Sequence, residues 1–458
     1  MTATLDSLRA SYEAAGQGHV FDGFDALEDS ARASFLAELA AIDLPLVERL
    51  ALKVGRDAGS GAAPTLEPAE AWPHDADGNE AARAHGAELL AAGKVGFVLV
   101  AGGQGSRLGY DGPKGAYSIG PVTDRCLFDW HAARIQATGT RHGFAPVWYV
   151  MTSRANDAAT RAFFAEHDRF GFAESDVVFF SQDMLPALDL GGRIVLSAPG
   201  EVFLAPNGHG GTLAALRTSG ALDDMARRGI EQLSYFQVDN PLARPGDTLF
   251  LGAHASSGAD MSSKVVPKRD AEEKVGVIGR VNGALGCIEY SDLSDELRYA
   301  KADDGRLLFN AGNIAVHALR RDFVERLTEG GDLDLPWHVA KKALTVMDAS
   351  GATTKIDGVK FETFVFDALG KAERSVTMEV ERAQEFSPVK NAEGSDSPDT
   401  CRADLDRIGR EILGTSAPAD GPVEVDPRAA ETPDEFTSRT STLTVLKSAT
   451  GTTVTAPR

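Results

Sequence analysis

Residues 95–109 read VGFVLVAGGQGSRLG, an apolar run that leads directly into a loop with four glycines. A short run without polar residues, bounded by turn residues, is typical of a strand that is buried on both faces. Helical stretches at 127–138 and 156–169 alternate with further apolar runs, which occupy 147–151, 176–180 and 233–238. This alternation predicts an α/β fold in which helices cover a mainly parallel sheet.

The glycine-rich loop follows the first predicted strand, and ligands of parallel sheets bind at the carboxyl ends of the strands. Gly102, Gly103 and Gly105 have no Cβ, so their backbone N–H groups can approach phosphate oxygens closely. Arg107 and Lys114 would neutralise the phosphate charge. The loop therefore predicts a phosphate site, whereas a purely structural turn would use glycines as well.

Two common phosphate-binding motifs are excluded by counting residues. The dinucleotide fingerprint GxGxxG, read from Gly103, requires a glycine at the position of Leu108. A Walker loop requires glycine before its lysine and serine or threonine after it, but Lys114 stands between Pro113 and Gly115. The loop belongs to neither class.

Composition narrows the classes of protein further. The 458 residues include 67 acidic and 46 basic ones, a formal net charge of -21, which argues against general nucleic-acid binding. No apolar run approaches the ~20 residues that span a bilayer, and the N-terminus does not resemble a signal peptide. The three cysteines are too few and too scattered for a disulfide framework or a zinc cluster. We therefore expect a soluble cytoplasmic protein without a nucleic-acid or membrane partner.

The chain is predicted to have three parts. Residues 1–93 are expected to form a helical region with a flexible loop at 55–65 and a last helix at about 79–92, and residues 94–390 the α/β domain that carries the glycine-rich loop. Residues 391–458 form a small C-terminal region. This region contains one helical face and a threonine-rich end that is either loose or holds a strand or two; the face consists of Leu405, Ile408 and Ile412.

The loop GGxGxRLG, with its following Pro-Lys pair, resembles that of the UDP-sugar pyrophosphorylases, in particular the UDP-N-acetylglucosamine pyrophosphorylase branch. This resemblance implies a Rossmann-like nucleotidyltransferase domain. It also implies that Gly102, Gly103 and Gly105 hold the nucleotide of UTP. Arg107 and Lys114 would then bind the charge that develops during transfer.

Two further segments resemble the nucleotide-binding parts of that family. Gln182 lies in SQDMLPALDL, which is similar to the segment whose glutamine reads uracil, and an amide offers both a donor and an acceptor. The stretch APNGHGG at 205–211 resembles the second glycine-rich loop. There Gly208 would present its backbone to uracil, and His209 would reach the sugar.

Asp239 lies in VDN, at the end of the fourth predicted strand. A single aspartate at a strand end is by itself either a cap, a solvated residue or a metal ligand. The resemblance implies the metal role, and Mg²⁺ prefers carboxylate and phosphate oxygens.

The remaining matches concern the sugar and a second lysine. Glu289 in IEYSDL and Asn313 in FNAGNI match sugar-hydroxyl ligands of the family. Phe364 and Phe366 in KFETFVFDAL resemble a wall of the sugar pocket, although aromatics at alternate positions are also typical of a core. Lys390 in FSPVKNA resembles a second phosphate-binding lysine.

The resemblance implies that UTP and an α-sugar 1-phosphate, foremost N-acetylglucosamine 1-phosphate, are converted to UDP-sugar and pyrophosphate. Glucose 1-phosphate is an alternative substrate because of His209. The N-acetylglucosamine branch usually has asparagine at this position, whereas the glucose branch has the sequence Gly-His-Gly that is found here. A non-catalytic sugar-nucleotide-binding protein is a second alternative. Such a protein would not need Arg107, Lys114 and Asp239, and the presence of all three favours an enzyme. The sequence does not indicate an oligomeric state.

Overall fold

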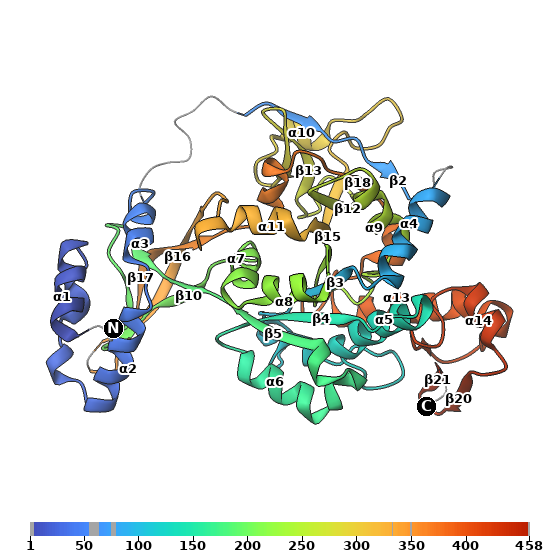
Figure 1. Ribbon diagram of the computed structural model, residues 1–458, viewed down its shortest axis with the longest axis horizontal. Helices are drawn as coiled ribbons and strands as arrows, with labels where there is room; N and C mark the ends of the chain where they lie inside the picture. The colour runs from blue at the N-terminus through green and yellow to red at the C-terminus, as the bar shows by residue number, and fades with distance from the viewer. Residues whose placement is uncertain (1–3, 55–63, 75–78, 332, 349, 457–458) are drawn as a thin grey trace. The chain divides into compact units, whose positions relative to one another are not determined.

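The computed structural model describes residues 4–54, 64–74, 79–331, 333–348 and 350–456, and the chain divides into two compact units (Figure 1). The first unit comprises Met1–Ala63, Gln182–Thr212 and Asp334–Val365, and the second comprises Pro64–Ser181, Leu213–Leu333 and Phe366–Arg458. Each unit therefore combines three separate stretches of the chain. The predicted division at residues 93 and 390 describes the chain differently and stays a prediction.

The second unit is built on a central sheet with the strand order β2-β18-β12-β15-β11-β3-β4-β5. These strands are β2 (Trp72–Pro73), β3 (Val95–Val100), β4 (Val147–Ser153), β5 (Val177–Gln182), β11 (Gln232–Gln237), β12 (Met261–Pro267), β15 (Ala311–Arg320) and β18 (Thr377–Glu379). Strand β3 lies parallel to both β11 and β4, whereas β15 is antiparallel to β11 and β12. The four predicted apolar strands are thus neighbours, which confirms the α/β class.

The helices of this unit include the predicted ones. They are α4 (Glu80–Ala91), α5 (Leu127–His142), α6 (Asp157–Glu166), α7 (Gly211–Thr218), α8 (Ala221–Arg228), α9 (Thr248–Ser256), α10 (Asp295–Tyr299), α11 (Arg321–Leu327) and α12 (Arg382–Glu385). Gly93, with φ +67°, follows α4 in the left-handed conformation expected of a glycine that ends a helix. Among the described residues, no helix has both the length and the apolar character to cross a membrane.

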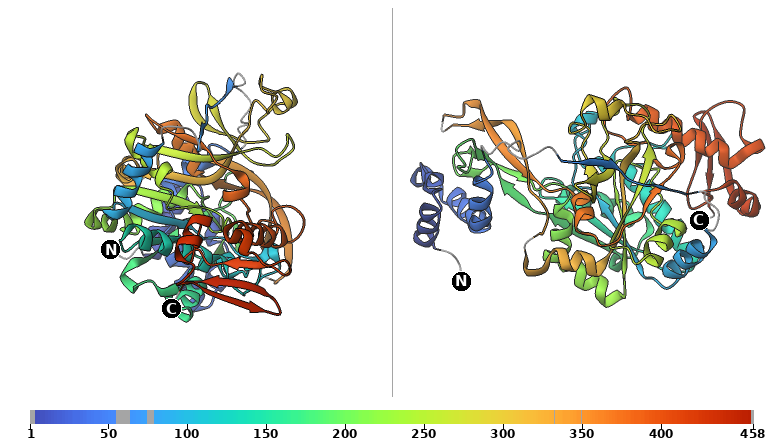
Figure 2. Two further views of the ribbon diagram at one scale, coloured as in Figure 1. Left: turned by 90° about the vertical axis from the view of Figure 1, so that its right-hand side faces the viewer. Right: turned by 90° about the horizontal axis from the view of Figure 1, so that it is seen from above.

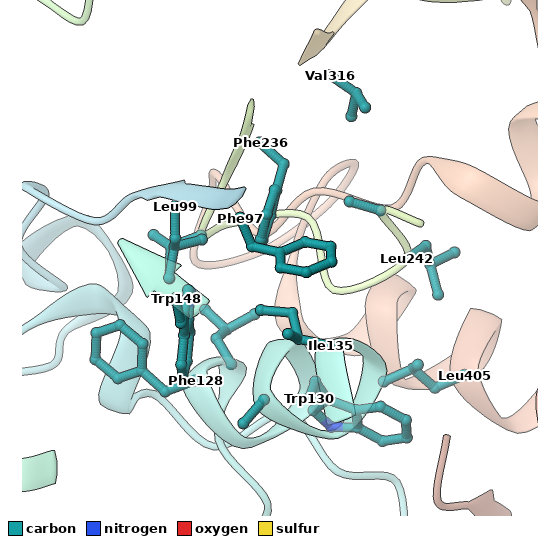
Figure 3. Packing of buried hydrophobic residues seen from close by; sticks show 14 of the residues in the cluster. Phe97, Leu99, Phe128, Trp130, Ile135, Trp148, Phe236, Leu242, Val316 and Leu405 are labelled. Atoms are coloured by element: carbon teal, nitrogen blue, oxygen red, sulfur yellow. The ribbon is translucent and has the colours of Figure 1, made fainter. Parts of the chain in front are cut away.

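Continuous apolar strands bury both faces of the sheet. Phe97 of β3 and Trp148 of β4 are fully buried and share one core cluster with Ile135 of α5, as Figure 3 shows. Burying a side chain of this kind contributes about 1.5–3 kcal/mol. The core therefore fixes the carboxyl edge of β3, from which the glycine-rich loop emerges.

A smaller β-layer extends the sheet. It consists of β1 (Leu66–Pro68), β13 (Val277–Val281) and β14 (Ala284–Ile288), and β13 pairs with β1, β14 and β15. Strands β1 and β2 were not predicted, because two or three residues are too few to show a period.

The first unit contains helices and hairpins. Its elements are α1 (Leu5–Ala14), α2 (Asp29–Ala40), α3 (Leu44–Ala51), β6 (Met184–Pro186), β7 (Leu188–Asp189), β8 (Leu196–Ala198), β9 (Glu201–Val202), β10 (Leu204–Pro206), β16 (His338–Met347) and β17 (Thr353–Glu362). Tyr12 of α1 and Leu39 of α2 are buried, and the Tyr12 hydroxyl donates to the Leu39 carbonyl at 2.9 Å, so these two helices pack against each other. Most of the predicted loop at 55–65, namely residues 55–63, lies outside the described residues.

The C-terminal part belongs to the second unit and is drawn in red in Figure 2. It consists of α13 (Pro398–Leu413), β19 (Val423–Val425), α14 (Pro433–Arg439), β20 (Thr444–Ser448) and β21 (Gly451–Thr455). Leu405, Ile408 and Ile412 are buried, as their spacing predicts. The chain end forms a hairpin of β20 and β21 rather than a loose tail. A buried ion pair of 2.5 Å between Arg125 and Asp426 ties this part to the start of α5.

Candidate active site

The glycine-rich loop after β3 closes on itself. The Lys114 amide donates to the Gly103 carbonyl at 3.1 Å, and the Gly105 amide donates to the Gly112 carbonyl at 2.9 Å. A Cβ at Gly103 would meet no atom within 4 Å, whereas one at Gly105 would lie 2.7 Å from Tyr110 Cδ1. Gly103 thus leaves open space that a phosphate can approach, and Gly105 is needed for packing inside the loop.

Two residues that the sequence analysis missed hold this loop. The Asn156 side chain donates to the carbonyls of Ala101 at 2.8 Å and Gly103 at 3.1 Å, and the Ser153 hydroxyl donates to Gly102 at 2.8 Å. Both side chains are buried and lie just beyond the apolar core of β4. Their place at the carboxyl end of a neighbouring strand is a signal that could have identified them.

Lys114 and Asp239 are brought together from distant parts of the chain. Asp239 follows β11, and its Oδ2 lies 3.1 Å from Lys114 Nζ; the Lys114 side chain is 16% exposed and that of Asp239 is 15% exposed. Arg107 lies in a short 3₁₀ turn, Ser106–Leu108, and is exposed. The predicted phosphate lysine and the predicted metal carboxylate therefore share one location beside the loop.

Lys390 follows Val389, whose backbone is hydrogen-bonded to that of Asp239. The Val389 amide donates to the Asp239 carbonyl at 2.8 Å, and Lys390 Nζ lies 5.5 Å from the centre of the Phe386 ring. The Asn240 side chain secures this arrangement, because it accepts from the Ser387 amide at 3.0 Å. The backbone next to Lys390 therefore lies beside Asp239, which follows β11 at its carboxyl end.

A buried histidine, His131, is hydrogen-bonded to the backbone directly before Asp239. His131 Nε2 lies 3.0 Å from the Val238 carbonyl, so this nitrogen donates to it. Burial lowers the pKa of His131 to about 4, so the ring is neutral at neutral pH. The residue before Asp239 is therefore fixed by an uncharged donor from α5.

Glu289 and Asn313 meet at Gly276. A Cβ on Gly276 would lie 2.6 Å from Cys287 Sγ and 3.7 Å from Glu289 Oε1. The Asn313 amide donates to the Gly276 carbonyl at 2.8 Å, and its side chain donates to Cys287 Sγ at 3.8 Å. Burial raises the pKa of the Cys287 thiol, and the Glu289 carboxylate raises it further. The two predicted sugar ligands thus flank a neutral thiol.

Gln182 and Gly208, the predicted uracil-reading residues, belong to the first unit. Gln182 ends β5 and is buried. Gly208 has φ +83°, and a Cβ there would lie 2.4 Å from the Thr363 carbonyl oxygen. Only glycine combines this conformation with so close an approach.

His209 and Phe364 are neighbours in the first unit. The Val365 amide donates to His209 Nδ1 at 3.2 Å, which places the ring proton of a neutral His209 on Nε2. The Phe364 ring centre lies 5.3 Å from that of His209 and 4.7 Å from that of His338, a residue that the sequence analysis did not single out. Phe366 belongs to the second unit and is buried, so its role as a pocket wall stays a prediction.

A different set of residues resembles a metal site in its composition. His74, Asp247 and Glu385 bring their ligand atoms within 4.8 Å of one another. The fully buried Lys264, however, places its Nζ 2.6 Å from Asp247 and 2.7 Å from Glu385. These carboxylates raise the pKa of Lys264 against the opposing effect of burial. The group is thus a structural ion-pair network whose cation is an ammonium.

The chain is similar to known proteins over most of its length. The family described as UTP–glucose-1-phosphate uridylyltransferase matches residues 73–396. The chain is 37% identical to the Homo sapiens UDP-N-acetylhexosamine pyrophosphorylase-like protein 1, over 88% of this chain and 84% of that protein. It is 38% identical to the Saccharomyces cerevisiae UDP-N-acetylglucosamine pyrophosphorylase, over 72% and 71%. The crystal structure of the Trypanosoma brucei UDP-N-acetylglucosamine pyrophosphorylase with an inhibitor has a TM-score of 0.80 and 25% identity, and covers 95% of this chain and 94% of that one.

Proposed function

The chain belongs to the UTP–glucose-1-phosphate uridylyltransferase family, and from this membership we propose that it makes a UDP-sugar and pyrophosphate from UTP and an α-sugar 1-phosphate. The observation that carries the proposal is the contact of Lys114 with Asp239 beside the open face of Gly103. A cation and a carboxylate in this position suit a nucleotide phosphate and the metal that accompanies it.

The reaction requires positioning and charge more than proton transfer. A phosphate oxygen of the sugar 1-phosphate forms a bond to the α-phosphorus of UTP, while the bond from that phosphorus to the bridging oxygen breaks and pyrophosphate leaves. The nucleophile is already an anion, so no side chain has to remove a proton. Arg107, Lys114 and Lys390 offset the negative charge that accumulates around the α-phosphorus.

Mg²⁺ is the cofactor that we propose, with Asp239 as its protein ligand. The fit is chemical: Mg²⁺ is commonly held by one or two carboxylates together with substrate phosphates and water. Asp239 offers a partly exposed carboxylate beside the phosphate loop. Bound there, the ion would neutralise phosphate charge. Lys114 would then exchange its bond to Asp239 for one to a phosphate.

N-acetylglucosamine 1-phosphate is the proposed sugar substrate, because relatives from Saccharomyces cerevisiae and Arabidopsis thaliana are named for the UDP derivative of that sugar. Glucose 1-phosphate is the second candidate, which the sequence Gly-His-Gly at 208–210 favours. We assign sugar contacts to His209, Glu289, Asn313, Phe364 and Phe366. Gln182 and Gly208 are assigned to uracil, and Gly102, Gly103 and Gly105 to the phosphates.

A cytoplasmic location is part of the proposal. Cys126, Cys287 and Cys401 are all free thiols, as expected in a reducing compartment.

The test of function is pyrophosphate release from UTP and a panel of sugar 1-phosphates with Mg²⁺ present. Turnover of N-acetylglucosamine 1-phosphate supports the proposal. Binding of a UDP-sugar without turnover of any sugar phosphate would instead identify a non-catalytic binding protein.

A further inference from the structure

A cavity of 280 Å³ in the second unit is lined by four arginines. Arg134 and Arg141 come from α5, Arg83 comes from α4, and Arg244 precedes α9. None of the residues assigned above to nucleotide, sugar or metal lines this cavity. Four guanidinium groups and three carboxylates line this hollow, so basic groups outnumber acidic ones there although the net charge of the chain is -21.

The acidic residues of the lining already have cationic partners. Glu431 accepts from Arg134 at 2.7 Å and from Arg141 at 2.9 Å, and Glu435 accepts from Arg141 at 2.6 Å. The third acid of the lining, Asp247, is paired with the buried Lys264 at 2.6 Å. These carboxylates are therefore bonded to cations other than the two remaining arginines.

Arg83 and Arg244 form no ion pair with a carboxylate anywhere in the described part of the chain. Among the described residues, the hydrogen bond of the Arg83 guanidinium is a long one of 3.5 Å to the His74 carbonyl. Arg244 donates from Nη2 to the amide oxygen of Gln384 at 3.2 Å, while its Nε is buried and has no hydrogen-bond partner. A buried guanidinium N–H without an acceptor is costly, so Arg244 can bond to an acceptor bound in the cavity that it lines.

A nearby histidine, His142, lies beside one of these arginines. His142 lines the cavity at the end of α5, where burial lowers its pKa and the adjacent Arg141 lowers it further. An anion in the cavity would relieve this repulsion.

We propose that this cavity is a second anion site, which binds a phosphate-type oxyanion. Guanidinium groups present parallel N–H donors that match phosphate oxygens in pairs. Arg83 and Arg244 would bind the ion directly, and the hydroxyl of Thr248, which also lines the cavity, would complete its coordination. Arg134 and Arg141 would contribute charge while remaining bonded to Glu431.

The proposed site is separate from the phosphate loop. Helix α5 begins at Leu127, shortly after the loop that ends at Lys114, and carries Arg141 near its other end. Arg141 lies 14 positions after Leu127, about 21 Å along the helix at 1.5 Å per residue, whereas Arg134 lies halfway and donates from Nε to the Pro241 carbonyl at 2.8 Å. Binding at the two places can therefore be distinguished by substitution.

The experiment measures thermal unfolding of the full chain during titration with potassium phosphate, with potassium chloride added to keep the ionic strength constant. A ligand that binds only the folded state raises Tm in a saturable way. We expect such a rise in the wild type, and an apparent affinity at least tenfold weaker in the double variant Arg83→Gln, Arg244→Gln. Arg83 is exposed, so the single variant Arg83→Gln provides the same test without a risk to folding.

Two controls distinguish phosphate binding in this cavity from phosphate binding elsewhere on the protein. Arg227→Gln with Arg280→Gln removes the same charge from exposed positions and should leave the rise in Tm unchanged. Lys114→Ala should also retain it, because that lysine belongs to the phosphate loop. The proposal is wrong if the wild type shows no saturable rise, if Lys114→Ala abolishes the rise, or if Arg83→Gln and the double variant both keep full affinity.

Discussion

The Lys114 ammonium lies 3.1 Å from Asp239 Oδ2, although 125 positions separate the two residues in the chain. Each neutralises the charge of the other beside the glycine-rich loop. If Lys114 binds phosphate and Asp239 binds a cation, the ligands must replace this ion pair. The two residues are then coupled, so removal of one changes what the other does in the free protein.

Lys114→Ala should reduce kcat by on the order of 10²-fold or more, because it removes a positioned charge that stabilises the transition state. The fold should survive, because Lys114 is not part of the apolar core and pairs with Asp239 beside the loop. Steady-state kinetics with UTP and a circular dichroism spectrum check both expectations. Lys94→Ala, which removes an exposed lysine paired with Glu231, is the matched control. Normal kcat and KM for UTP in Lys114→Ala would remove this lysine from the site.

Asp239→Asn keeps the shape of the side chain but removes its charge. We expect activity to fall sharply and the Mg²⁺ concentration for half-maximal activity to rise, because an amide oxygen binds Mg²⁺ more weakly than a carboxylate. Activity is measured across a Mg²⁺ titration. Asp434→Asn, at an exposed position of α14, serves as the control. An unaltered Mg²⁺ curve would show that Asp239 has only a structural role.

His209→Asn should change the choice of sugar more than the binding of UTP. The oxygen of asparagine can replace Nδ1 as the acceptor for the Val365 amide, so the backbone contact is kept while the outer edge of the ring is lost. A mismatched buried polar contact costs about 1–3 kcal/mol, so the ratio of kcat/KM for N-acetylglucosamine 1-phosphate to that for glucose 1-phosphate should shift roughly tenfold. A defect confined to KM for UTP would contradict the sugar assignment.

Stability should decrease in mild acid because of His131. Its pKa is about 4 in the folded chain and about 6.5 when unfolded, so the unfolded state takes up a proton first as the pH falls. The stabilisation is complete above about pH 6.5 and is lost between about pH 6.5 and pH 4. From about pH 7.5 to about pH 5 this loss is about 2 kcal/mol.

Urea unfolding at the two pH values checks this expectation. His131→Gln should lose less stability than the wild type between them, because it has no group that takes up this proton. His85→Gln, at a half-exposed position of α4, should behave like the wild type. Equal pH dependence of wild type and His131→Gln would show that another group is responsible.

Much of the architecture can be predicted from local patterns. The apolar runs predicted β11, β3, β4 and β5, because a strand buried on both faces needs apolar side chains on both. Helical spacing predicted the buried face of α13, and the glycine-rich loop predicted a candidate ligand site at the carboxyl end of β3. The short strands β1 and β2 and the antiparallel pairing of β15 could not be predicted in this way, since neither leaves a periodic signal.

The sequence by itself determined which side chains are available for phosphate and metal chemistry, because residue type and the end of each apolar run can be read directly from the chain. Only the tertiary structure decided that Lys114 contacts Asp239 and that Asn156 holds the loop. It also decided that the carboxylates of the group His74, Asp247 and Glu385 pair with the Lys264 ammonium. It also showed that the space beside Gly103 is open, whereas Gly105 packs against Tyr110. The physical reason is that hydrogen bonds and ion pairs act over a few ångströms, and the distance between residues remote in sequence depends on the order of strands in the sheet rather than on any local period.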